Sequence, residues 1–343
     1  MKKLSVMSGA LIAMVCITTG VLTTGAVPVG AVTRSATAKL NWTAVASSQK
    51  PPPTAAGTMA YDPVLGTDIL FGGTPGTTGD TWAWNGTTWS IVATTGPAAR
   101  QSMEMVYDAF TESIVLFGGI SSTGTGLDDT WTFNGTWTKE NPTTSPPYLA
   151  YYSMAYDAAN NTVVLAGGQG AGGNESTWVW NGGNWNKIVS TPFTAPNNLV
   201  GATMSYDPAL GANILFGGFL NGSHAHFATG TWEWNGSTWS ELTTATTPPL
   251  RQNAVSFYDT KAGGVVVFGG YEPSLPAPSL GNDTWVFNGT DWSQLVTTSS
   301  PEPRVSAQAA QGANYGPPLL FGGYDSSIAK YSGYLHDTWT LET

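Results

Sequence analysis

The chain has 343 residues, of which only 10% are charged, and it is rich in glycine, tryptophan and small polar residues. This composition is typical of many short strands joined by tight turns, and it argues against a mainly helical protein. The formal net charge is −10. An acidic surface repels the phosphate backbone, so the charge argues against a nucleic-acid partner.

Residues 1–31 have the features of a signal peptide. A basic start, Met1-Lys2-Lys3, precedes an apolar run over residues 4–17, and small residues around Ala26 and Ala31 offer cleavage sites. The apolar run is too short and too interrupted for a membrane span. We therefore expect a secreted or surface-exposed bacterial protein that has no stable membrane span once the leader is removed.

The part expected to remain, residues 32–343, contains no cysteine, because the chain's single cysteine is Cys16. The fold therefore forms without disulfides and offers no thiolate chemistry. Lipidation at Cys16 is an alternative to cleavage, although the residues before it suit that modification poorly. Loss of Lys2 and Lys3 with the leader brings the net charge near −12.

An internal repeat dominates the rest of the chain. An apolar run that ends in a glycine pair recurs every 46 to 53 residues. The pairs are Gly72-Gly73, Gly118-Gly119, Gly167-Gly168, Gly217-Gly218, Gly269-Gly270 and Gly322-Gly323. Each pair is followed by a Thr-Trp step, at Trp82, Trp131, Trp178, Trp232, Trp285 and Trp339. A period of this length is the signature of a solenoid or a propeller.

Each repeat divides into four predicted strands, a to d. In the first repeat they are residues 58–61, 68–71, 81–84 and 88–92. Asn85-Gly86 lies between strands c and d, and Asn-Gly favours the positive φ angles of a tight hairpin. The repeat therefore predicts small four-stranded antiparallel sheets.

The two ends of the chain complement each other. The last repeat stops after strand c, near Trp339, whereas residues 40–45 form a strand d with no repeat before it. Pairing these two segments would leave no open sheet edge, so we predict a closed ring of six sheets. The expected blades cover residues 51–93, 94–141, 142–189, 190–243, 244–296, and 297–343 with 40–46.

The glycine pair after an apolar strand, the downstream Trp residues and the period near 50 residues resemble the Kelch-repeat β-propeller family. The resemblance covers residues 40–343 and implies an all-β β-propeller, as in the propeller domain of galactose oxidase. The six repeats of this chain set the expected number of blades at six. A copper radical site would require a cysteine linked to a tyrosine, and residues 32–343 contain no cysteine. We therefore reject the oxidase activity, and we assign the repeated Gly and Trp residues to turns and to packing between blades.

Function is expected where the repeats differ. The b–c and d–a segments vary and emerge on one face, which makes that face the candidate binding surface. The candidate residues there and at the channel are Arg100, Arg251, Arg304, Glu104, Tyr148, Tyr151, His224, His226, Tyr271, Tyr324 and His336. The three arginines share one register before strand a. They are expected either to point at the channel mouth, where they could clamp a carboxylate, or to pair with acids inside their own blades.

These features favour a non-catalytic binding module that recognises a glycan or an extracellular protein through the b–c and d–a face. One alternative is an epimerase or lyase acting on an acidic sugar at the channel mouth, and another is a scaffold in a surface assembly. A metal held by His224, His226 and His336 is geometrically conceivable, but we expect no metal and no cofactor. We also expect a monomer and assign no catalytic residue.

Overall fold

The computed structural model describes residues 39–343 except for 76–78, 171–175, 189–195, 197–198, 221–227, 229, 278 and 312–315. The predicted leader and the histidines His224 and His226 lie outside the described residues. Among the described residues no helix is both long enough and apolar enough to span a membrane.

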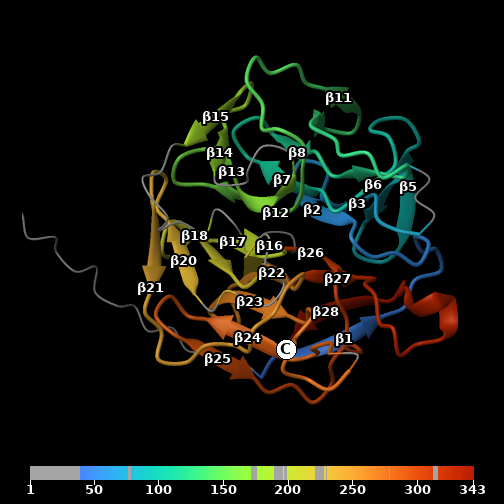
Figure 1. The fold of residues 1–343 in the computed structure, drawn as a ribbon. Coiled ribbons are helices and arrows are strands. Elements are labelled where there is room, and N and C mark those ends of the chain that lie inside the picture. The colour runs from blue at the N-terminus through green and yellow to red at the C-terminus, as the bar shows by residue number, and fades with distance from the viewer. Residues whose placement is uncertain are drawn as a thin grey trace, which may run out of the picture. The chain divides into compact units, whose positions relative to one another are not determined.

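The described part of the chain forms six four-stranded antiparallel sheets, the blades of a propeller (Figure 1). Blade 1 contains β2 (Thr58–Asp62), β3 (Thr67–Phe71), β4 (Thr81–Trp84) and β5 (Trp89–Ala93). Blade 2 contains β7 (Glu104–Asp108), β8 (Ser113–Phe117), β10 (Thr130–Phe133) and β11 (Trp137–Lys139). Blade 3 contains β12 (Leu149–Asp157), β13 (Thr162–Gly170), β14 (Thr177–Trp180) and β15 (Trp185–Ile188).

The second half repeats this order. Blade 4 contains β17 (Thr203–Asp207), β18 (Ala212–Phe216), β20 (Thr231–Trp234) and β21 (Trp239–Leu242). Blade 5 contains β22 (Val255–Asp259), β23 (Gly264–Phe268), β24 (Thr284–Phe287) and β25 (Trp292–Leu295). Blade 6 contains β26 (Gln308–Ala310), β27 (Leu319–Phe321), β28 (Thr338–Glu342) and β1 (Asn41–Val45).

Blade 6 joins the two ends of the described chain. Strand β1 pairs antiparallel with β28, with Asn41 opposite Glu342 and Val45 opposite Thr338. Trp42 of β1 is buried against Phe257 and Phe268 of blade 5. The N-terminal strand therefore supplies both the outer edge of the last sheet and part of its packing.

The core lies between blades. The second strand of each blade is buried on both faces, as in β8 and β23, because one side packs on the preceding blade and the other on the following one. The fourth strands bury a tryptophan near their start and expose the residues that follow it, as in β25. This pattern explains why the second strands read as continuous apolar runs.

A ring of tryptophan hydrogen bonds joins neighbouring blades. Each blade has a tryptophan at or next to the start of its fourth strand. The indole N–H of this tryptophan donates to a threonine of the preceding blade, the first residue of that blade's third strand. The pairs are Trp42–Thr284, Trp89–Thr338, Trp137–Thr81, Trp185–Thr130, Trp239–Thr177 and Trp292–Thr231, at 2.7–3.1 Å. The Thr-Trp tryptophans of the third strands are mostly half-buried instead. Packing between blades thus falls mainly to the fourth-strand tryptophans.

The glycine pairs allow neighbouring blades to approach closely. Both glycines of each pair have positive φ, 56–77° for the first and 84–106° for the second. A Cβ on Gly217 would lie 2.6 Å from the carbonyl oxygen of Arg251 in the next blade, and one on Gly167 would lie 2.3 Å from that of Leu199. Glycine is required here both for the backbone angle and for the contact.

Candidate functional site

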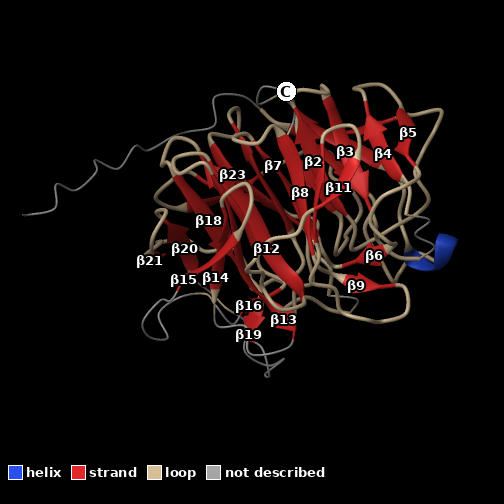
Figure 2. Ribbon diagram, turned by 90° about the horizontal axis from the view of Figure 1, so that it is seen from above, coloured by secondary structure: helices blue, strands red, loops and turns tan. Residues whose placement is uncertain are grey.

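One face of the propeller carries the variable segments, and we call it the loop face. It includes two short ribbons, β6 (Arg100–Gln101) with β9 (Ile120–Ser121) and β16 (Leu199–Val200) with β19 (Phe219–Leu220). Figure 2 shows both ribbons on the same side of the sheets. The first strand of each blade starts from this face and runs along the central axis.

The three predicted arginines are buried, with relative exposures of 1–2%, and they share one arrangement. In blade 5, Arg251 pairs with both carboxylate oxygens of Asp283, at 2.7 and 2.8 Å, and donates to the carbonyl of Gly269. Asp283 also accepts the indole N–H of Trp285. Arg100 with Asp129 and Arg304 with Asp337 repeat this geometry.

These contacts correct the expectation that the arginines point at the channel mouth. Arg251 uses its Nε, Nη1 and Nη2 atoms on protein acceptors, and Glu272 lies 3.5 Å from Nη2. None of the three arginines lines the cavity described below. The second expectation, pairing with an acid inside the blade, describes the structure. The guanidinium lowers the pKa of Asp283 against the opposing effect of burial.

Other predicted residues lie on the loop face without forming one site. The rings of Tyr324 and Tyr334 are in contact, with centroids 5.1 Å apart. Tyr148 packs against Gly126, since a Cβ there would lie 2.0 Å from its ring. Tyr271 bridges two loop segments through its backbone, and His336 is half-buried. Among the described residues, no group of three or more His, Cys, Asp or Glu side chains could hold a metal.

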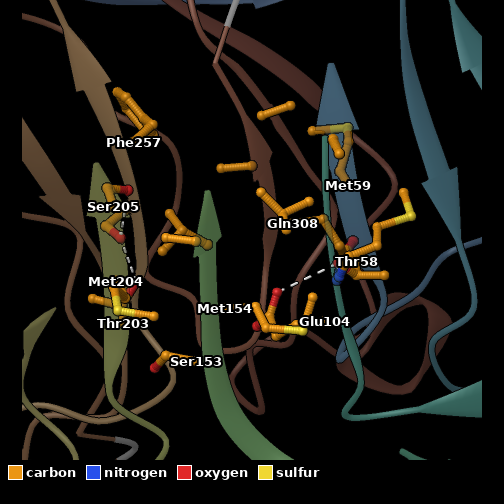
Figure 3. Close-up of a pocket in the computed structure, with 18 of the residues that line it drawn as sticks. Thr58, Met59, Glu104, Ser153, Met154, Thr203, Met204, Ser205, Phe257 and Gln308 are labelled. Atoms are coloured by element: carbon orange, nitrogen blue, oxygen red, sulfur yellow. Dashed lines mark hydrogen bonds between the residues drawn. The ribbon is translucent and has the colours of Figure 1, made fainter. Parts of the chain in front are cut away.

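Two predicted residues, Glu104 and Tyr151, line the central channel. The channel contains a cavity of about 500 Å³ whose walls are the first strands of all six blades. Figure 3 shows side chains from several of these strands converging on it. The cavity is thus built from the innermost strand of each blade.

A ring of backbone hydrogen bonds bounds the cavity at the loop face. Six described residues, one per blade, form this ring. Five of them lie two positions before the first strand of their blade, and the sixth, Tyr151, lies within the longer strand β12. The six are Ala56, Ser102, Tyr151, Gly201, Asn253 and Ser306. Each amide donates to the carbonyl of the equivalent residue in the preceding blade, at 2.7–3.1 Å, and the series closes on itself. All six have φ between 51° and 70°. We call this the amide ring.

Glu104 is the acidic residue of the cavity wall. Its Oε2 atom accepts a long hydrogen bond of 3.4 Å from Thr58, whose Oγ1 atom also accepts the amide of Met105. Behind it, the hydroxyl of Tyr152 accepts the amide of Glu104 and donates to the carbonyl of Phe117. Burial raises the pKa of Glu104 to about 8, and the Thr58 bond only partly opposes that effect.

The remaining wall combines hydroxyl groups with soft apolar side chains. Thr203 donates to Ser256 at 2.6 Å, and Ser205 lies 3.0 Å from the same Ser256 hydroxyl. Four methionines occupy one register of the first strands of blades 1 to 4: Met59, Met105, Met154 and Met204. At the end away from the loop face the wall contains five tyrosines: Tyr61, Tyr107, Tyr156, Tyr206 and Tyr258. Such a wall can hold both the polar and the apolar faces of a small molecule.

No protein-family model matches the sequence. A solved structure, titled "Structure of YjhT", is similar to this chain with a TM-score of 0.65 and 15% sequence identity. The match covers 87% of this chain and 99% of that one. At this identity the likeness shows the fold alone, a six-bladed β-propeller.

Proposed function

We propose that the chain is a secreted or surface-exposed binding module that recognises a glycan, with the terminal unit of the glycan held in the central channel. The observation that carries the proposal is the cavity of about 500 Å³ on the propeller axis. Its volume falls within the range of small-ligand sites in proteins. The rigid walls and the hydroxyl groups of Thr203, Ser205 and Ser256 suit a ligand rich in hydroxyl groups.

The loop face supplies the second part of the proposal. The cavity is bounded at this face by the amide ring, and segments of different length surround it. A glycan bound in the channel would therefore leave its remaining units against these segments. Their variation between blades would give selectivity beyond the channel itself.

A glycan-array screen of residues 32–343 tests this function. We expect Ser256→Phe, which fills the cavity, to abolish the hits, and Ala309→Phe in blade 6 to do the same. The control is Ser240→Phe on the exposed fourth strand of blade 4. Circular dichroism and thermal melting show that each variant is folded. Hits that survive both cavity variants would place recognition elsewhere, with a protein partner at the loop face as the competing interpretation.

One observation favours an enzyme as the second candidate. Glu104 has a raised pKa near 8, which suits a group that both accepts and donates a proton near neutral pH. An acidic-sugar substrate is not supported in the same way, because the arginines are committed to their own aspartates. In this case Glu104→Gln would abolish turnover of a bound sugar, followed by NMR, while binding persists.

A further inference from the structure

The cavity has an unbalanced charge. Of the described residues that line it, Glu104 alone has a side chain that ionises to a carboxylate, and no lysine, arginine or histidine is among them. The fixed charges behind Glu104 are Arg100 and Asp129, which pair with each other. A ligand in this cavity therefore meets a carboxyl group without a cation from the protein.

The Glu104 carboxylate is also short of hydrogen-bond donors. Among the described residues, the side-chain partner of this carboxylate is Thr58, at 3.4 Å, which is the outer limit of a useful hydrogen bond. The hydroxyl of Tyr152 is committed to the carbonyl of Phe117. A carboxylate normally accepts several bonds, so Glu104 has no cationic partner among the described lining residues and fewer hydrogen-bond donors than an ionised carboxylate needs.

The other walls suit the carbon body of a cation. Methionine is polarizable and adapts to irregular shapes, and four methionines share one register beside the cavity. Tyrosine faces attract cations through the ring quadrupole, and five tyrosines surround the far end.

We propose that the ligand places an organic ammonium group beside Glu104, so that the glycan unit held in the channel is amine-bearing. The inference rests on the proposed function, because it names the chemistry of the same cavity. The carboxylate supplies the missing negative partner, the ammonium supplies the missing donors, and the methionines and tyrosines enclose the carbon atoms.

Proton linkage follows from this arrangement. The ammonium favours the ionised carboxylate, so binding releases a proton from Glu104 below pH 8 and strengthens as the pH rises through that value. Among the described residues, Tyr152 contacts the backbone of Glu104, and Arg100 and Asp129 act on Tyr152 from behind it. Tyr152 stays neutral over this range, because burial raises its pKa well above the usual value.

The cavity can be probed without a known ligand, because a single cysteine can be introduced. In a Cys16→Ser background, Ser256→Cys places a thiol in the blade opposite Glu104. Its modification rate is measured with trimethylammonium-ethyl methanethiosulfonate and with the anionic sulfonatoethyl analogue, at pH 6 and pH 9. Ser90→Cys on the exposed β5 strand corrects for the intrinsic rates of the reagents. The modification rates of both thiols are also measured in proteins that carry Glu104→Gln in addition.

We expect the corrected ratio of cationic to anionic rates at Ser256→Cys to rise at least about tenfold from pH 6 to pH 9. Glu104→Gln should hold the ratio flat. A ratio that does not change with pH, or that changes equally with Glu104→Gln, overturns the ammonium site but leaves a channel site intact. If neither reagent modifies the Ser256→Cys thiol in the folded protein, the channel is closed to ligands and the proposed function fails with it.

Discussion

At the scale of single residues, the arginine–aspartate–tryptophan unit is a way to stabilise a blade. Blades 2, 5 and 6 contain an arginine and an aspartate at matched positions, whereas blades 3 and 4 have a buried leucine there, Leu149 and Leu199, with Ser176 and Gly230 opposite. One propeller therefore contains blades with the arginine–aspartate pair and blades with a leucine in place of the arginine. The leucine blades show that this scaffold accepts an apolar side chain at the arginine position.

This comparison predicts the effect of breaking the pair. Arg251→Met leaves Asp283 partly buried without its partner, and we expect unfolding to require about 3 kcal/mol less. The double variant Arg251→Leu with Asp283→Ser copies blade 3 and should recover more than half of that loss. Urea denaturation of the three proteins measures both effects. Equal loss in the single and double variants would show that the pair does more than hold the blade together.

A second residue-scale prediction concerns pH. Burial raises the pKa of Glu104 to about 8 and that of Asp68 to about 7. Both groups bind a proton more tightly in the folded state, so their effect is to lower stability as pH rises from about 5 to 8. Glu104→Gln should make the decline shallower up to pH 8, whereas Asp68→Asn should do so only up to about pH 7. Thermal melts across this pH range measure the decline for the wild type and both variants. A decline of stability with pH that is as steep in the variants as in the wild type would contradict the prediction.

At the scale of elements, each second strand ends in a glycine pair whose backbone packs directly against the backbone of the next blade. The first glycine of each pair touches the carbonyl of the residue that precedes the neighbouring first strand, as Gly217 touches Arg251. The second glycine then donates to the same carbonyl, as Gly218 does at 2.8 Å. This junction also fixes where the amide ring begins. The glycine pairs therefore position the cavity as well as the blades.

Two glycines separate the cost of the backbone angle from the cost of contact. Gly66 and Gly217 have similar φ, 68° and 77°, but a Cβ on Gly66 would have nothing within 4 Å. Gly66→Ala should therefore cost about 1 kcal/mol from the angle alone. Gly217→Ala adds a clash with the next blade, and we expect a loss at least twice as large. Denaturant midpoints for the two variants give the comparison, and equal losses would contradict it.

The elements also show what the sequence could predict. The glycine pairs and the tryptophans mark every blade, and Asn-Gly turns mark five of the six, because each is required by local geometry. The amide ring has no such mark, since its left-handed positions are occupied by residues as different as Ala56, Tyr151 and Asn253. The register of strand a predicts Glu104 near the channel, whereas Tyr151 is predicted only from its position near the register of the arginines. The arginines were ambiguous, because a register position does not tell whether a side chain turns inward or toward its own sheet.

At the scale of the whole molecule, stability depends on a ring of similar interfaces. Each of the described interfaces contains one indole-to-threonine bond, and Trp42 supplies the one between blades 6 and 5. The strand that closes the ring is therefore bound by the same contacts as any other fourth strand. Its position at the start of the chain makes it no weaker a part of the ring.

Replacement of Trp42 tests this equivalence. Trp42→Ala removes a buried indole and should cost about 3–5 kcal/mol, the same range as Trp292→Ala in blade 5. Val296→Ala, at a side chain that is 81% exposed, is the control and should change little. The measurement is the free energy of unfolding of the three variants. A Trp42 variant as stable as the control would mean that the first strand contributes little to the ring.

The pairing of the first and last strands also decides how the molecule responds to a pull. Asn41 lies opposite Glu342, so tension applied through the two termini loads the ladder from one end and opens its bonds in succession, like a zipper. Strand β1 begins and strand β28 ends on the side away from the loop face, so a tether or fused partner joined next to either strand end would leave that surface uncovered.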